Sequence, residues 1–498
     1  MFARARSRES GAAMVLTAMA MVVLLGMAAF GTDLAWFYLN ASRVQRAADA
    51  GALGGVVWLP SQTATANSTA LSIAKQNGYD NADADVDVTS GVVAGEANQL
   101  QVTVRDTVPT FFAKILGFQT MDIERSAVAE YIPPLKLGSP AGQFGNNCDP
   151  NQPGCTGQAN FWANIHGKWT DRTMGDAYAS YCVGASDVPA CTQNPIARPG
   201  GYLYGIESTG AFTVQGLDLR FFNTSGGNPT SDTIRTGDRG CEDWTPSAAA
   251  TCGPTMRVRL YAPDPTPLDL SDNAAPLCSA TLTPTGQVLP AAAYTWATPN
   301  GNACWTQSGS GIYVLQITHL DPGATVDRAG LNRYSIRANG AGAKLFALGD
   351  FSIYNNASGT TTSFYLAEVP TYYHGKTFVV ELYDAGESAD NGTLQVVDPS
   401  ATTFNDGECR IYSRNHPTAA VPDPTWALQQ TIAAGASCQE TVAPGEYNGR
   451  WLKFEMDLPA SYSCSTCWWN MRYVYPSAVN DTTTWRAYMI GNPIHLID

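Results

Sequence analysis

Charged residues are scarce in this 498-residue sequence, and most of them are acidic. Asp, Glu, Lys and Arg make up only 14% of the chain, and the formal net charge is −14. Nucleic-acid-binding proteins present basic faces that neutralise phosphates. The composition therefore argues against nucleic acid as a partner and suits an exported β protein.

Recognisable catalytic motifs are also missing. The chain has only five histidines, and none stands in a His-Glu-x-x-His pattern. Neither a Gly-x-Ser-x-Gly elbow nor a phosphate-binding Gly-x4-Gly-Lys-Ser/Thr loop occurs. Paired carboxylates can hydrolyse glycosides, but that chemistry depends on a separation in space that the sequence does not reveal. We predict that the protein is not an enzyme, with an anchored hydrolase as the least favoured alternative.

Cysteine is absent from the first 147 residues, whereas twelve cysteines follow. An even number confined to one part of a chain predicts disulfides and an oxidising compartment. A zinc site is disfavoured because the one Cys-x-x-Cys pair has no second pair at finger spacing. The simplest of many connectivities joins sequence neighbours: Cys148/Cys155, Cys182/Cys191, Cys241/Cys252, Cys278/Cys304, Cys409/Cys438 and Cys464/Cys467.

Residues 12–31 form an uncharged, largely apolar run that is long enough to cross a bilayer as a helix. Three arginines precede the run and Asp33 follows it, which places residues 1–11 in the cytoplasm by the positive-inside rule. A cleaved signal peptide is the alternative, although its apolar core is typically only about 7–15 residues. We favour an uncleaved, single-pass anchor, with the bulk of the chain periplasmic or extracellular.

The segment from Asp33 to Trp58 contains no proline, so the membrane helix is expected to continue beyond the bilayer. About 45 helical residues would reach roughly 70 Å. Small residues recur four positions apart in this extension, which lets another helix approach closely. We favour packing within the same domain over a contact with another subunit. The predicted helix-packing residues are Ala47, Ala48, Gly51, Ala52 and Gly55.

Several N-terminal motifs together resemble a known family. They are Glu9-Ser10-Gly11, Thr32-Asp33-Leu34, the VQRAADAGALGG segment at 44–55 and the VPTFFAKILG segment at 108–117. Over residues of about 5–130 the chain resembles the N-terminal module of TadE/TadG-like Flp (tight adherence) pilus-assembly proteins. This resemblance implies a component of the bacterial cytoplasmic (inner) membrane that is not an enzyme and whose partners are other pilus-assembly proteins.

Two departures limit what the resemblance implies. Pseudopilin relatives carry Glu five positions after their cleavage site, and counting from Gly11 that position is Leu16. Processing by a prepilin peptidase is therefore not expected. Many TadG-type proteins also carry a von Willebrand factor A domain with an Asp-x-Ser-x-Ser metal motif, and the nearest match here is Asp350-Phe-Ser352-Ile-Tyr354. That metal site is not expected either.

The predicted fold is mostly β. Residues 32–132 form the helix extension and a small α/β module, and residues 133–158, rich in Pro, Gly and Asn, form a linker. From residue 159 onward, short aromatic and β-branched runs alternate with Gly, Pro, Asn and Asp, which is typical of sandwiches and jelly rolls.

A weak internal repeat divides this β region. Its matched segments are Gly201–Glu207 with Ser363–Val369, Arg257–Ala262 with Val379–Asp384, and Gly311–Ile317 with Gly449–Glu455. One predicted disulfide precedes the third segment in each half. We therefore predict two tandem jelly-roll-like sandwiches, at residues 159–338 and 339–498, each stapled by one equivalent disulfide.

Two binding sites are suggested within the second sandwich. Asp384, Glu387 and Asp390 lie in one short loop, and carboxylates are the ligands that calcium prefers. A solvated acidic turn is the favoured alternative. Tyr372, Tyr373, Trp468 and Trp469 are candidates for a surface that stacks on glycans, although core packing explains adjacent strand aromatics more often.

Two functional hypotheses follow from these observations. The first is a membrane-anchored component of a Tad/Flp-type pilus assembly or surface adhesion system, whose sandwiches serve assembly or adhesion. The second is a membrane-tethered adhesin, unconnected to a pilus, that binds a glycan or a protein. In both, the N-terminal helix contacts the lipid bilayer.

Overall fold

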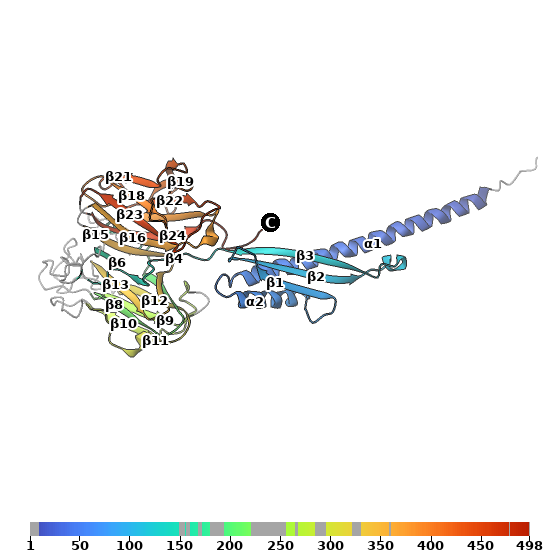
Figure 1. The fold of residues 1–498 in the computed structure, drawn as a ribbon, viewed down its shortest axis with the longest axis horizontal. Helices are drawn as coiled ribbons and strands as arrows, with labels where there is room; N and C mark the ends of the chain where they lie inside the picture. The colour runs from blue at the N-terminus through green and yellow to red at the C-terminus, as the bar shows by residue number, and fades with distance from the viewer. Residues whose placement is uncertain are drawn as a thin grey trace, which may run out of the picture. The chain divides into compact units, whose positions relative to one another are not determined.

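The computed structural model describes residues 9–148, 155, 160–167, 172–179, 194–220, 255–263, 267–283, 295–320, 330–357, 360–477 and 479–497. The chain divides into two compact units. Unit 1 comprises Met1–Pro133 together with Gly491–Asp498, and unit 2 comprises Pro134–Ile490. Most of their elements are labelled in Figure 1.

Unit 1 contains a single 48-residue helix, α1 (Glu9–Val56), that includes the whole apolar run. The helix is long and apolar enough to cross a membrane, and none of its most hydrophobic window is buried. A second helix and four antiparallel strands complete the unit, in the sheet order β1-β2-β3-β25. The bounds are α2 (Thr63–Gln76), β1 (Val86–Val92), β2 (Gln99–Pro109), η1 (Ala113–Leu116), β3 (Thr120–Tyr131) and β25 (Ile494–Ile497).

The core of unit 1 is built from small side chains on the helices and branched ones on the sheet. Alternation along β2 turns Leu100, Val102 and Val104 inward, and all three are fully buried. Alanines spaced four apart on α2 complete the contact. Because these side chains are short, α1, α2 and the sheet pack closely.

The C-terminal strand belongs to unit 1, not to the second sandwich as the sequence had indicated. Ile494 pairs with Tyr131, and the register continues to Ile497 opposite Val128. The Ile132 N–H donates to the carbonyl of Pro493 at 2.8 Å. Unit 2 is thus an insertion between two neighbouring strands of unit 1.

Unit 2 consists of two large antiparallel sheets. One has ten strands in the order β10-β9-β12-β7-β14-β4-β16-β23-β18-β21, and the other has eleven in the order β11-β8-β13-β6-β15-β24-β17-β22-β19-β20. Within the described residues the first half contains β4 (Lys136–Leu137), β5 (Gln143–Phe144), β6 (Asn160–His166), β7 (Tyr202–Ser208), β8 (Phe212–Leu217), β9 (Thr255–Tyr261), β10 (Cys278–Leu282), β11 (Thr306–Gln307), β12 (Gly311–Leu320), β13 (Leu331–Asn339) and β14 (Ala343–Ala347). The second half contains β15 (Asp350–Ala357), β16 (Thr360–Glu368), β17 (Thr377–Tyr383), β18 (Gly392–Val397), β19 (Cys409–Asn415), β20 (Ala427–Ile432), β21 (Gln439–Val442), β22 (Arg450–Asp457), β23 (Trp468–Tyr475) and β24 (Val479–Met489).

The sheet orders reveal an internal duplication. The order β10-β9-β12-β7-β14 recurs as β20-β19-β22-β17-β24, and β11-β8-β13-β6 recurs as β21-β18-β23-β16. The two tandem sandwiches predicted from the sequence are therefore present. Of the three pairs of segments matched in the sequence, only the pair on β12 and β22 is correct. The sheet order makes β17 the equivalent of β7, and β19 the equivalent of β9.

Strands β4 and β15 join the two sandwiches into continuous sheets. Leu137 on β4 pairs with Ala347 of the first sandwich and with Ala367 of the second. Ile353 on β15 pairs with Ala163 of the first and Thr483 of the second. Each connecting strand lies inside a sheet, so the two sandwiches share backbone hydrogen bonds within one unit.

Four disulfides lie among the described residues, and each joins sequence neighbours: Cys148–Cys155, Cys278–Cys304, Cys409–Cys438 and Cys464–Cys467. Cys182, Cys191, Cys241 and Cys252 lie outside the described residues.

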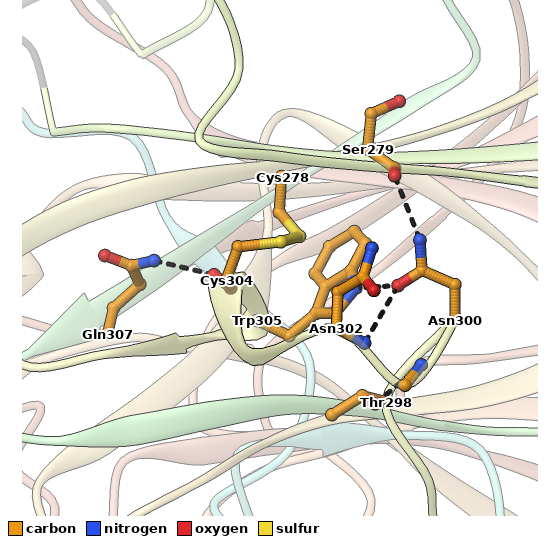
Figure 2. Close-up of a disulfide and its surroundings, with 9 residues drawn as sticks. Cys278, Ser279, Thr298, Asn300, Asn302, Cys304, Trp305 and Gln307 are labelled. Carbon is orange, nitrogen blue, oxygen red and sulfur yellow. Dashed lines mark hydrogen bonds between the residues drawn. A yellow bond between two sulfur atoms is a disulfide. The ribbon is translucent and has the colours of Figure 1, made fainter.

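The disulfides of the two sandwiches are not fully equivalent. Cys304 and Cys438 both precede the short strands β11 and β21, but their partners lie on β10 and β19, which are not matched strands. Figure 2 shows the first of them beside Trp305, whose indole N–H donates to Asn300 at 2.7 Å. Cys304 and Cys438 are thus in equivalent places in the two halves, whereas Cys278 and Cys409 are not.

Candidate functional site

The predicted helix-packing residues of α1 face α2 and the sheet of the same unit. Ala47, Ala48 and Ala52 are buried. A Cβ atom added at Gly55 would lie 2.5 Å from Leu100 Cδ2 and 2.7 Å from a carbonyl oxygen of α2. The small side chains therefore allow close packing inside unit 1.

Asp33 forms a polar clamp between α1 and the turn that joins β2 to β3. Its Oδ1 accepts the backbone N–H of Phe111 at 2.8 Å, and its Oδ2 accepts those of Phe112 and Ala113 at 3.0 and 2.6 Å. Trp36 packs edge-on against Phe111, with ring centroids 5.3 Å apart. Sequence reasoning used Asp33 only as a topology marker. The sequence predicts a short helix after Pro109, but it did not show that Asp33 would accept the first N–H groups of that helix.

The acidic loop proposed for calcium is held by neighbouring strands. Asp384 is fully buried in a left-handed conformation (φ 62°) and accepts the Gly449 N–H. Asp481 accepts the N–H groups of Gly386 and Glu387 at 3.1 and 3.4 Å. Within the part of the chain that the structure describes, no group of three or more His, Cys, Asp or Glu side chains is placed to hold a metal ion. The calcium site, including Asp390, stays a prediction.

The four aromatic residues suggested for glycan stacking do not form one surface. Trp469 and Tyr373 are both buried in the core. Alternation along β23 turns Trp469 inward and leaves Trp468 half-buried. Trp468 instead lies edge-on to Tyr365, which is 41% exposed, with centroids 6.0 Å apart.

A buried polar cluster lies near the start of β7. The Tyr202 hydroxyl donates to Asp176 at 2.6 Å, and burial raises the pKa of Asp176 to about 6. Arg198 pairs with the buried Asp350 and lies 3.5 Å above the Tyr178 ring. The cavity beside them measures about 10 Å³, which is room for about one water molecule. Its size suits a structural cluster and excludes a substrate.

Two family matches cover the N-terminal region. Residues 11–60 match the family described as putative Flp pilus-assembly TadE/G-like, and residues 47–129 match the one described as putative Tad-like Flp pilus-assembly. Residues 11–129 thus carry a Tad-like Flp pilus-assembly module. The Tad-like module coincides with α1, α2 and β1–β3 of unit 1, and it includes the helix-packing residues and the Asp33 clamp.

Comparisons of the whole chain add little to the Tad-like assignment. No curated protein matches the sequence. Among solved structures, the N-terminal CBM22-1-CBM22-2 tandem domain from Paenibacillus barcinonensis Xyn10C covers 82% of this chain and 92% of its own, at 9% identity and a TM-score of 0.14. A structure of infectious bursal disease virus Gx strain covers 61% and 65%, at 10% identity and a TM-score of 0.08. Scores this low carry no argument about fold or function.

Proposed function

We propose that this chain is a single-pass, membrane-anchored component of a Tad/Flp-type pilus assembly or surface adhesion system. One observation carries the proposal: the family matches begin inside an apolar helix whose most hydrophobic window is wholly exposed. That helix continues without a break into the packed core of the Tad-like module. The anchor and the module are therefore one element.

The proposed topology places the N-terminus in the cytoplasm, and the part of unit 1 after the apolar run together with unit 2 on the exported side of a bacterial cytoplasmic membrane. The arginines before the apolar run support this orientation. Four disulfides in unit 2 support an oxidising compartment for it. Unit 1 would contact other pilus-assembly proteins, and the tandem sandwiches would serve adhesion. The role is structural, not enzymatic.

The topology of unit 1 allows the two roles to be tested separately. Ile132 directly follows β3, Pro493 directly precedes the antiparallel β25, and the two are hydrogen-bonded neighbours, so residues 133–492 can be replaced by a two-residue Asn-Gly turn. Deletion of the gene should reduce pilus number, length or protein export, and the full chain should restore them. We expect the hairpin variant to restore pili without restoring attachment. Unchanged pili and export after gene deletion would refute the assembly role.

The second candidate function is a tethered adhesin unconnected to a pilus, and the duplicated sandwich favours it because paired domains offer two surfaces to a ligand. The test compares the full chain in nanodiscs with the hairpin variant, on a glycan array and on cell surfaces, with and without calcium. Binding by the full chain alone supports the adhesin. Equal binding by both proteins, or by neither, contradicts it.

A further inference from the structure

The turn between β2 and β3 carries an apolar cluster that the described part of unit 1 leaves uncovered. Its side chains are between 44% and 79% exposed. Lys114 is the only charged residue between Asp106 and Asp122. Exposed clusters of this kind mark interaction surfaces. We call it the apolar tip, and it consists of Phe111, Phe112, Ile115, Leu116 and Phe118.

The apolar tip lies beside α1, and contacts with α1 fix its height, that is, its position along the helix axis. Asp33, which accepts three backbone N–H groups of the same turn, lies two residues beyond the uncharged run 12–31. Trp36, almost one helical turn further, contacts the Phe111 ring. The end of the β2–β3 hairpin can be followed in Figure 1, where the short η1 coil lies near the middle of α1.

On the proposed anchoring, in which residues 12–31 of α1 span the bilayer, that height is the boundary of the bilayer. Twenty helical residues rise about 30 Å, which equals the thickness of a typical hydrocarbon core. Asp33 then lies only about 3 Å beyond the hydrocarbon edge. Phe and Leu side chains enter the boundary between headgroups and acyl chains, and the long apolar stem of a lysine lets its charge reach the headgroups.

We propose that the apolar tip inserts into the exported-side leaflet as a second membrane contact, beside the α1 span. Lys114 would reach the lipid phosphates while the five apolar side chains enter the boundary between headgroups and acyl chains. Two contacts fix the orientation of unit 1 on the membrane, where one helix alone would leave it free to rotate. The inference rests on the proposed anchoring by α1.

The experiment measures depth in the bilayer with nitroxide spin labels on the full chain in nanodiscs that contain phosphatidylglycerol and phosphatidylcholine. Labels are placed singly through Leu116→Cys at the tip and Met21→Cys in the apolar run. Ala94→Cys is the matched control, since Ala94 is exposed in the β1–β2 turn at the opposite end of the same sheet. All three positions are exposed, so none of the substitutions is expected to disturb the core.

We expect the label at position 116 to collide freely with oxygen and to be shielded at least five-fold from a water-soluble nickel complex relative to position 94, as position 21 is. A label at 116 that is as open to nickel as the one at 94, with 21 still shielded, overturns the second contact and leaves the anchor intact. Access to nickel at position 21 would refute the anchor itself. Shielding of position 116 from both reagents overturns the proposal in favour of a protein partner.

Discussion

The carboxylate of Asp33 and the backbone N–H of Ala113, eighty residues apart in the sequence, are joined by a hydrogen bond of 2.6 Å. Two further N–H groups of the same turn donate to this carboxylate. Asp33 is only 6% exposed, so water competes weakly for these bonds. The contact connects the end of the apolar run to the β-sheet of the Tad-like module.

Replacing Asp33 by Asn should release this turn. One carboxylate oxygen becomes an amide NH₂ that cannot accept a backbone N–H, and hydrogen bonds to charged groups contribute about 1.5–3 kcal/mol. We expect the amides of residues 111–118 to exchange at least ten-fold faster with deuterium in Asp33→Asn. Asp122→Asn is the control on the same hairpin, because Asp122 is half exposed and its pair with Arg105 contributes little. Equal exchange in both variants would contradict the clamp.

Glycines on α1 should differ sharply in their tolerance of a methyl group. Gly55→Ala places a Cβ within 2.7 Å of a backbone carbonyl oxygen that cannot easily move, whereas no atom lies within 4 Å of the same position at Gly26. Overpacking costs about 1–3 kcal/mol, which exceeds the gain of up to about 1 kcal/mol in helix propensity. We expect Gly55→Ala to lower the melting temperature of unit 1, whereas Gly26→Ala should not lower it. A neutral Gly55→Ala would show that the helix pair can shift.

Local patterns predicted much of the fold. The absence of proline between Asp33 and Trp58 indicated one continuous helix, and α1 is continuous to Val56. The duplication was visible, but its strands were partly misaligned because neighbouring strands of a sandwich share the same alternation. The four-residue strand at 494–497 carries too little pattern to indicate a partner more than 360 residues away.

The candidate sites show where sequence reasoning stops. Asp384 and Glu387 are three residues apart in the sequence, but their loop is held from elsewhere, by Gly449 in the turn before β22 and by Asp481 on β24. Closeness in the sequence therefore did not predict which groups these carboxylates would contact. The apolar tip was not predicted, because sequence alone does not distinguish exposed apolar residues such as Phe111 and Phe112 from core residues; the structure shows their exposure.

The stability of unit 2 should contain a pH-dependent contribution from Asp481. Burial raises the pKa of this carboxyl from its ordinary value of 3.8 to about 6. Between these values the folded state keeps a proton that the unfolded state has lost, so stability falls as the pH rises from about 4 to 6. Asp481→Asn removes this contribution. As the pH rises from 4 to 7, the free energy of unfolding of the variant should therefore rise by up to about 3 kcal/mol relative to that of the wild type, since one pKa unit corresponds to about 1.4 kcal/mol. Urea unfolding at both pH values measures the difference, and a constant offset would contradict the raised pKa.

The disulfides of the second sandwich should contribute unequally. Cys409–Cys438 spans 29 residues, whereas Cys464–Cys467 spans three. A disulfide that closes a longer loop restricts the unfolded chain more. The expected stabilisation is about 3–4 kcal/mol for the longer span and about 1–2 kcal/mol for the shorter one. We expect the alanine pair at 409 and 438 to lower the urea midpoint of unit 2 clearly more than the alanine pair at 464 and 467. Equal shifts would mean that strain or packing, and not loop length, decides the contribution.

The C-terminal strand should stabilise unit 1 selectively. Removing residues 491–498 deletes the backbone pairs from Ile494↔Tyr131 to Ile497↔Val128 and takes away the His495 partner of the buried Glu130. At about 1 kcal/mol for each backbone hydrogen bond, the loss should reach about 2–4 kcal/mol. The uncovered edge of β3 would then be free to pair with other chains, which promotes aggregation.

Hydrogen exchange measures this loss of stability in the truncated chain. The amides of β3 should exchange faster, and those of β17 and β22 should exchange at an unchanged rate. His495→Ala is the matched control, because it keeps the strand and removes only the side-chain pair, so the β3 amides should stay better protected than in the truncated chain. Equal protection of β3 with and without the strand would show that β25 adds no stability to the Tad-like module.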